Sequence, residues 1–551
     1  MFRNKTASQK NFAISPRGDI QRSVLPMKQT RKQAFNASEL IPIMLEEVLP
    51  GDTWQHTEAI AARLATPIAP VIDDLHLETF YFFIPNRILW EGWEDFITGA
   101  DLITQMPTVE PYNGTNSTLL LGGVLDHMGL LPQTYTTSAF NVNILPVLGY
   151  FTTYNEWFRD QNLQEPFIWP TAAAINTRDF TQNGTAWDQK CVRANKPHDY
   201  FTSSLPFAQK GPSVSLPLGT TAPVIPITAG TSFPAFQQDG GGANRALATL
   251  AGTAGAAYVD TGSPYFPING AAQRLIWQAS GLQADLSTAT AATLNALRIA
   301  ATTQQLLEKD ARGGSRYTEQ LLIHFGAKSP DYRLQRPEYL GGSRLPITVN
   351  PIAQTAAYDA APDDEASAIG NLGAEMHANG NNRTFTYAST EHGYILGLAV
   401  ARATPTYQQG TRKHWRRRTR LDYAFPVFAN LGEQAVATQE IYQPANNAPS
   451  VATWGYQERY AEMRYTPNEI TGVLRSTAPQ PLDWWHYSEE FGTEPGLNPA
   501  FITDKTQETL ARSLFSSPSA QWSSQFVMDI SHVSRVARML PAYGVPGLTR
   551  F

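Results

Sequence analysis

The chain has 551 residues and a formal net charge of −6, and only 16% of its residues are charged, against roughly 25% in ordinary soluble proteins. Its single cysteine, Cys191, excludes an intramolecular disulfide and any metal site built from several cysteines, and no apolar run is long enough to span a membrane. Proline and glycine number 39 each, which favours short strands joined by long ordered loops, and the low charge is typical of a surface that copies of one chain cover mutually.

The N-terminal 38 residues form a basic segment. They carry eight positive charges against one negative charge, a net of +7, and they include Arg3, Lys5 and Lys10. Two interpretations stay open, a solvated tail and an arm that neutralises phosphate. The segment lacks the apolar core of a signal peptide, so we expect the chain to be made and to fold in a cytoplasm.

The stretch 73–90, DDLHLETFYFFIPNRILW, predicts the strand around which the rest is organised. Its apolar residues begin on alternate positions and then occupy both faces, with the β-forming types Phe, Tyr and Ile. Such a strand must be covered twice, by a second sheet and by a long loop or another subunit. Pro85 ends it, and the apolar spacing from Leu89 to Ile97 predicts one short amphipathic helix.

The next segments alternate between loops and short helices. Residues 100–150 are loop-like, and Tyr154, Trp157 and Phe158 recur at helical spacing. Residues 211–284 have few charges and many Ala, Gly, Thr and Pro residues. A disordered linker is one interpretation of that segment. Its aromatic residues, which true linkers lack, favour an inserted excursion that orders by packing on copies of itself.

The C-terminal half returns to strands after one longer helix. Residues 287–311 predict a helix that starts at Ser287 and stops at the glycine pair after it. Residues 351–390 are expected to be loop. A strand is predicted at 391–403, and strands or strand–loop units are predicted at 425–436 and 524–530.

Catalytic signatures are absent from the sequence. It holds no phosphate-binding loop of the GxxxxGK[ST] type, no HExxH pair and no GxSxG turn. Neighbouring carboxylates such as Asp73 and Asp74 point to opposite faces of a strand, which does not suit a glycosidase pair. We expect no catalytic residue, metal or cofactor. A pair of carboxylates brought together from distant parts of the chain remains open.

One basic cluster lies at residues 411–420, TRKHWRRRTR. Arginine binds phosphate through a rigid fork, and an aromatic side chain among arginines can stack on an unpaired base. The alternative is a solvated loop, or arginines paired with carboxylates of a neighbouring subunit. The candidate DNA-binding residues are Arg412, Lys413, Trp415, Arg416, Arg417, Arg418 and Arg420, together with Arg3, Lys5 and Lys10 of the basic segment.

Long segments of the chain resemble the major capsid proteins of microviruses, the small icosahedral phages with circular single-stranded DNA, and most closely the gokushovirus-like branch. The resemblance lies in ELIPIMLEEVLPGDTW (39–54), TPIAPVIDDLHLETFYFFIPNRILWEGWEDF (66–96), YNEWFRDQNLQ (154–164), HDYFTSSLPFAQKG (198–211), LEKDARGGSRYTEQLLIHFGAKSPDYRLQRPEYLGG (307–342) and NPIAQT (350–355). It continues in EHGYILGL (391–398), TYQQGTRKHW (406–415), FANLGEQAV (428–436), GYQERYAEMRYTPNEITG (455–472) and the ending LPAYGVPGLTRF. These segments span nearly the whole chain in order. The resemblance weakens most within 211–284.

The resemblance implies an all-β fold, a single eight-stranded jelly roll with long inserted loops and a few short helices. It implies a basic arm at 1–38 in the interior, jelly-roll parts at 39–210 and 285–551, and a surface protrusion at 211–284 on the three-fold axes. Copies would form a T=1 shell around the genome in the virion after assembly in the host cytoplasm. The implied partners are the chain itself, the DNA, a small basic DNA-packaging protein, other virion proteins and a bacterial receptor.

Two other functions compete with a self-assembling shell protein. The first is a β-sandwich hydrolase that acts on bacterial surface carbohydrate, which requires facing carboxylates in an open cleft. The second is a binding module for single-stranded nucleic acid, whose affinity would fall steeply with salt.

Overall fold

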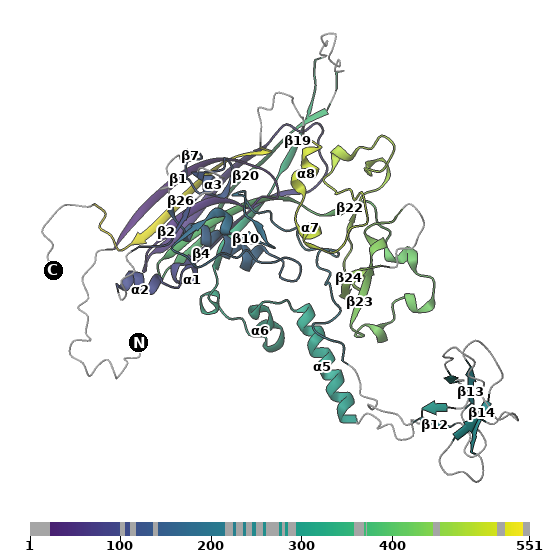
Figure 1. The fold of residues 1–551 in the computed structure, drawn as a ribbon. Coiled ribbons are helices and arrows are strands. Elements are labelled where there is room, and N and C mark those ends of the chain that lie inside the picture. The colour runs from purple at the N-terminus through teal and green to yellow at the C-terminus, as the bar shows by residue number, and fades with distance from the viewer. Residues whose placement is uncertain are drawn as a thin grey trace, which may run out of the picture. The chain divides into compact units, whose positions relative to one another are not determined.

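The computed structural model of the protein describes residues 22–99, 105–110, 117–135, 142–214, 224–226, 235–238, 245–249, 257–259, 275–277, 282–284, 294–356, 369–370, 372–444, 452–514 and 524–543. Antiparallel sheets dominate it and helices are few (Figure 1), which confirms the prediction of a mostly β chain. The chain separates into two compact units, residues 1–210 with 308–551, and residues 211–307. The second unit begins where the predicted insertion begins and ends at Leu307 instead of residue 284.

Two sheets build the first unit. The five-stranded sheet has the order β1 (Ser23–Phe35), β26 (Phe526–Arg538), β3 (Thr53–Leu64), β20 (Leu372–Ala388) and β19 (Thr348–Ala353). The four-stranded sheet has the order β18 (Glu338–Pro346), β4 (Leu75–Pro85), β21 (Gly393–Ala403) and β2 (Ile41–Val48). All neighbours in both sheets are antiparallel. Only Ile347 separates β18 from β19, so one continuous segment passes from one sheet to the other.

Strand β4 is covered on both faces, as the sequence predicts. Its inner face is buried against the other sheet, where the rings of Tyr81 and His56 of β3 lie 5.0 Å apart. On its outer face, Phe80 packs edge-on against Phe158 at 5.2 Å and Phe82 packs against Trp157. The outer cover is helix α4 (Leu145–Thr153), which continues as a π-helical turn, η2 (Tyr154–Phe158). A helical segment of the same chain therefore supplies the second layer, where the sequence predicted a long loop or another subunit.

A buried polar cluster lies between the two sheets. The carboxylate of Glu58 on β3 accepts hydrogen bonds from Tyr81 at 2.7 Å, from Thr79 at 3.0 Å and from Ser343 at 2.5 Å. Buried polar groups are costly unless they are paired, and these hydroxyls provide the partners. The cluster fixes the register of β3 against β4 and β18.

Two buried histidines lie on neighbouring strands of the five-stranded sheet. His56 Nδ1 lies 2.8 Å from Ser534 Oγ, and His532 Nε2 lies 3.0 Å from the carbonyl of Ile43. The two rings approach each other at 3.4 Å between His56 Nε2 and His532 Nδ1. This chain of contacts is satisfied when both rings are neutral, because each ring then has one donor and one acceptor.

The basic segment includes strand β1, whose inward positions carry polar Arg31 and Gln33, hydrogen-bonded to His127 O and Pro42 O, so it shows no apolar alternation. Two expectations from the sequence are wrong. Strand β20 falls in the region expected to be loop. The helix expected from Leu89 to Ile97 is two helices, α1 (Asn86–Leu89) and α2 (Trp93–Thr98), broken at Trp90–Gly92.

The remaining helices are α3 (Val124–His127), α5 (Leu294–Arg312), α6 (Tyr317–Phe325), α7 (Pro499–Ile502) and α8 (Thr506–Ala511). Helix α5 confirms the predicted helix, and Gly314 follows it at φ +87°, whereas Ser287 lies outside the described residues. Predicted strands 391–403, 425–436 and 524–530 correspond to β21, β23 (Glu433–Ala437) and β26. The predicted insertion holds the short strands β12 (Val224–Pro226), β13 (Ala235–Gln238), β14 (Arg245–Thr249), β15 (Ala257–Val259), β16 (Leu275–Trp277) and β17 (Leu282–Ala284).

Candidate nucleic-acid interface

The basic cluster predicted at residues 411–420 lies on a small subdomain with a core of its own. It forms two single-turn 3₁₀ helices, η5 (Lys413–Arg416) and η6 (Arg420–Asp422). They lie beside the strands β22 (Thr406–Tyr407), β23, β24 (Thr453–Glu458) and β25 (Asn468–Glu469). The core beneath contains Tyr200, Phe201, Tyr407, Val436, Ile441, Trp454, Ala461, Phe501 and Ile502. Segments far apart in sequence therefore hold the cluster in place.

Two local features fix the path of the basic segment. At Gly410 a Cβ atom would lie 2.0 Å from the carbonyl oxygen of Glu440, so only glycine fits this close approach of two backbones. Further along, the Asp422 carboxylate accepts hydrogen bonds from the backbone N–H groups of Thr419 at 2.7 Å and Arg418 at 2.8 Å. These two bonds hold the pKa of Asp422 below its ordinary value. The turn therefore presents the side chains of residues 418 and 420 on its outside.

Four of the six cationic side chains are paired with carboxylates of the same chain. Arg412 pairs with Glu469 and donates to Pro467 O at 3.1 Å. The carboxylate of Glu462 forms ion pairs with both the Lys413 ammonium, at 3.6 Å, and the Arg417 guanidinium, at 3.2 Å. A longer contact of 4.0 Å joins Arg416 to Glu440. The paired residues thus contribute to the stability of the subdomain.

The two central carboxylates differ in their electrostatic surroundings. Burial raises the pKa of Glu440 above its ordinary value, in spite of a backbone hydrogen bond from Ala437 and the nearby charge of Lys413. Burial also acts to raise the pKa of Glu462, but Lys413, Gln434 and Arg417 together outweigh it, and that pKa lies below its ordinary value. Glu462 is therefore the carboxylate that is most stabilised in its charged form, by its ion pairs with Lys413 and Arg417.

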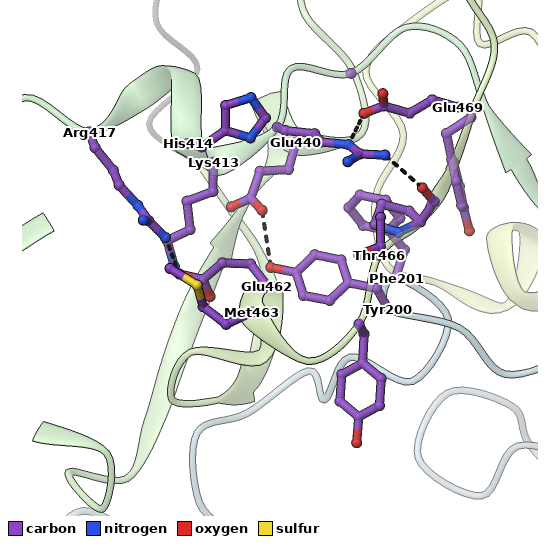
Figure 2. A pocket seen from close by; sticks show the side chains of 15 residues that line it. Tyr200, Phe201, Lys413, His414, Arg417, Glu440, Glu462, Met463, Thr466 and Glu469 are labelled. Atoms are coloured by element: carbon purple, nitrogen blue, oxygen red, sulfur yellow. Dashed lines mark hydrogen bonds and ion pairs between the residues drawn. The ribbon is translucent and has the colours of Figure 1, made fainter. Parts of the chain in front are cut away.

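A pocket of about 190 Å³ opens between the paired side chains (Figure 2). Tyr200 extends into it and donates a hydrogen bond of 3.0 Å to Glu440. Burial, followed by the charge of Glu440, raises the pKa of this phenol, so the group stays a donor. Lys413 and Arg417 reach Glu462 from the opposite side of the pocket. The three carboxylates in its lining balance its Lys and Arg side chains, so the pocket itself has no excess of positive charge.

The cluster retains three side chains available to a ligand. Trp415 is 76% exposed, and Arg418 and Arg420 are exposed without an ion pair to any described residue. Arg420 lies over the ring of Phe425 at 5.7 Å. These are the side chains of the predicted site that can contact phosphate and stack on a base. The candidates Arg3, Lys5 and Lys10 lie outside the described residues.

The residue pattern of the basic cluster does not reveal which side chains pair with it. Glu440, Glu462 and Glu469 all come from the stretch directly after it, and Tyr200 comes from more than 200 residues upstream. The only sequence signal for these partners was that the three glutamates follow the basic cluster along the chain. The pairing weighed from the sequence was with a neighbouring subunit, whereas these contacts lie within one chain.

Replacing Arg417 by alanine is expected to destabilise the subunit. Its side chain is only 10% exposed, and its loss leaves Glu462 with Lys413 as its only cationic partner among the described residues, so the free energy of unfolding should fall by about 1–3 kcal/mol. Replacing the exposed Arg418 should change it by no more than about 0.5 kcal/mol. Urea unfolding of both variants measures the difference, and equal effects would contradict the structural role of Arg417.

The described residues contain no group of three or more His, Cys, Asp or Glu side chains placed to hold a metal ion. They also contain no helix long and apolar enough to cross a membrane.

Comparison with known proteins gives consistent matches over nearly the whole chain. The sequence model of a family described as "Capsid protein (F protein)" matches residues 14–548. The capsid protein VP1 of Bdellovibrio phage phiMH2K is 38% identical over 552 residues, covering 98% of each chain. VP1 of Chlamydia phage 1 is 34% identical over 598 residues and VP1 of Spiroplasma virus 4 is 34% identical over 556 residues, each again covering 98% of both chains.

Proposed function

Since the chain belongs to the capsid protein (F protein) family of the microviruses, we propose that its copies assemble into a T=1 icosahedral shell that encloses a circular single-stranded DNA genome. The observation that carries this proposal is the match to a capsid protein family over residues 14–548. Members of this family are structural proteins and not enzymes, which speaks against the hydrolase alternative. Assembly would take place in the host cytoplasm.

The proposed fold of the subunit is a single eight-stranded jelly roll. Counted along the chain, with β18 and β19 as one segment, the main strands are β1, β2, β3, β4, β18–β19, β20, β21 and β26. The first pairs with the last, the second with the seventh, the third with the sixth and the fourth with the fifth. This nested pairing across two sheets supports the jelly roll, a double-sheet fold of eight strands.

The proposed contact with the genome uses Trp415, Arg418 and Arg420. They are the exposed part of the basic cluster, and they combine a base-stacking ring with two guanidinium groups. The rest of the cluster would position them through its ion pairs with Glu440, Glu462 and Glu469. Arg3, Lys5 and Lys10 of the N-terminal segment would contribute further phosphate contacts from the interior.

The other proposed partners follow from the family. A small basic DNA-packaging protein would share the genome with the N-terminal segment, and other virion proteins would complete the particle. The insertion at 211–284 would project at the three-fold axes and contact a receptor on the bacterial host. Its low charge supports packing of copies against one another.

Expression of the chain with its assembly partners should yield closed particles in electron micrographs, with DNA inside.

A variant in which Trp415, Arg418 and Arg420 are all alanine should assemble particles of the same size that retain severalfold less DNA, because each lost base stack and phosphate contact weakens the binding of the genome. The ratio of the absorbance at 260 nm to that at 280 nm measures the DNA content of the purified particles.

The control is the single variant Lys28→Ala, which removes an exposed positive charge from strand β1 outside the cluster. It should keep its DNA. If the parent chain forms no particles when it is expressed with its assembly partners, the proposal that it forms a shell is contradicted. Unchanged DNA content in the triple variant would contradict the assigned contact residues alone.

A further inference from the structure

A groove runs along the outer edge of strand β1. Its volume is about 1060 Å³, and it is lined by β1 residues of both faces, such as Lys32 and Gln33, but by no residue of the neighbouring strand β26. The hollow therefore follows the edge of the sheet and not one of its faces. Strand β1 ends the order of the five-stranded sheet, so its outward backbone N–H and C=O groups have no strand partner among the described residues. Such an edge is a template for a further strand.

Cationic side chains outnumber carboxylates in the lining of the groove, which includes Arg31, Lys32, Lys190 and Arg193, against Glu39 and Asp126. Lys32, Lys190 and Arg193 pair with the largely exposed carboxylates of Asp529, Asp188 and Glu508, which lie outside the lining, and such exposed pairs are weak. The side chain of Leu121 is exposed in the same lining. The buried Oε1 atom of Gln33 has no hydrogen-bond partner among the described residues, although its Nε2 donates to Pro42 O at 2.8 Å. An occupant with carboxylates, some apolar surface and a free donor would fit this groove.

The opposite edge of the same sheet has complementary properties. Strand β19 ends the sheet on that side and pairs with β20 as a hairpin. Apolar side chains of the hairpin are exposed at Ile352, Ile369 and Leu372. The connection between the two strands includes residues 357–368, which lie outside the described residues. Their sequence contains Asp359, Asp363, Asp364 and Glu365 and no basic residue.

We propose that the β19–β20 hairpin of one copy docks into the β1 groove of a second copy, with the carboxylates of residues 357–368 against the cationic lining. The inference rests on the proposed function, because it names one of the contacts through which copies would assemble. A chain cannot fill its own groove with this hairpin, since β26, β3 and β20 lie between the two edges and four strand spacings amount to roughly 19 Å.

The position of the two surfaces sets the symmetry of the contact. The hairpin and the groove are different surfaces on opposite edges, so the contact is heterologous, head to tail. Every copy then offers one hairpin and receives one, and a rotation that closes generates a ring.

Charge reversal on each side tests the contact. Lys32→Glu with Lys190→Glu alters the groove, and Asp363→Lys, Asp364→Lys and Glu365→Lys alter the hairpin. Lys32 and Lys190 form only exposed ion pairs, with Asp529 and Asp188, which contribute little to folding. Each set alone should lower the yield of particles at least about tenfold, and the two sets combined should restore it to within about threefold of the parent chain.

The matched control is Lys28→Glu, because Lys28 is exposed on β1 but does not line the groove. It should leave the yield unchanged, and thermal unfolding of each soluble variant should match the parent. Unchanged yield in the groove and hairpin variants, or no recovery on combining them, would overturn the contact. A groove variant that loses DNA while the hairpin variant behaves as the parent would show nucleic acid in the groove and would likewise overturn it. If the parent chain forms no particles, the proposed function fails first.

Discussion

Replacing Asp52 by alanine is expected to lower the free energy of unfolding by about 3–5 kcal/mol, because it breaks a buried ion pair and leaves one charge without its partner. Asp52 lies in the turn between β2 and β3 and is 0% exposed. Its Oδ2 accepts from Arg538 at 2.9 Å and 2.7 Å and from the backbone N–H of Leu49 at 3.0 Å. The pair joins this turn to the end of β26, so its loss weakens two strands together.

A matched variant is available on the same sheet. Asp529 of β26 pairs with Lys32 at 2.8 Å, but the two side chains are 47% and 76% exposed, and an exposed pair contributes about 0–1 kcal/mol. Chemical denaturation of Asp52→Ala and Asp529→Ala compares a buried with an exposed aspartate. If the two variants lose similar stability, the Asp52–Arg538 pair does not have the role assigned to it. Asp52→Asn, which keeps the volume, separates loss of charge from loss of packing.

Acid is expected to destabilise the subunit through the two buried histidines. Burial, with the neighbouring ring of His532, lowers the pKa of His56 to about 3, and burial lowers the pKa of His532 to about 4. In the unfolded chain both titrate near 6.5, so below that pH the unfolded chain binds more protons than the folded one. The contribution of these two histidines to stability should be constant above pH 6.5, fall by an amount on the order of 8 kcal/mol as the pH drops toward 3, and level off below.

The physical reason lies in the neighbours of the two rings. His56 faces Ser534, Tyr81 and Phe385, and His532 faces the carbonyl of Ile43. The charge of Arg31 further disfavours a proton on His532. Urea unfolding at several pH values should show a shallower dependence for His532→Gln, whose amide can still donate to the carbonyl. Parallel pH profiles for the variant and the parent would contradict this origin of the acid sensitivity.

The sequence was most informative where a strand is buried on both faces by its own residues. In β4 the inward positions Leu77, Tyr81 and Phe83 and the outward Phe82 and Ile84 are all buried, so the need for two covering layers follows from composition alone. The middle of β20, from Asn379 to Asn382, offers no such pattern, because its strand geometry comes from pairing with β3 more than 300 residues earlier in the chain. Pairing between strands so far apart in the chain cannot be predicted from the local sequence of either strand.

The candidate interface shows the same division. Residue types and spacing identified the basic cluster, and the exposed Trp415 and Arg418 agree with a ligand-facing role. The sequence could not separate these from Arg417, because that separation depends on Glu462 and on the depth of the subdomain core. The role of the cluster in binding DNA stays a prediction.

The position of β26 has a consequence for synthesis of the protein. This last strand fits between the first strand, β1, and β3, so the five-stranded sheet cannot close until about residue 538 has left the ribosome. At translation speeds of roughly 5–20 residues per second, β1 and β3 wait on the order of half a minute or longer for the strand that lies between them. A polypeptide that is terminated early therefore lacks the strand that joins β1 to the rest of the five-stranded sheet.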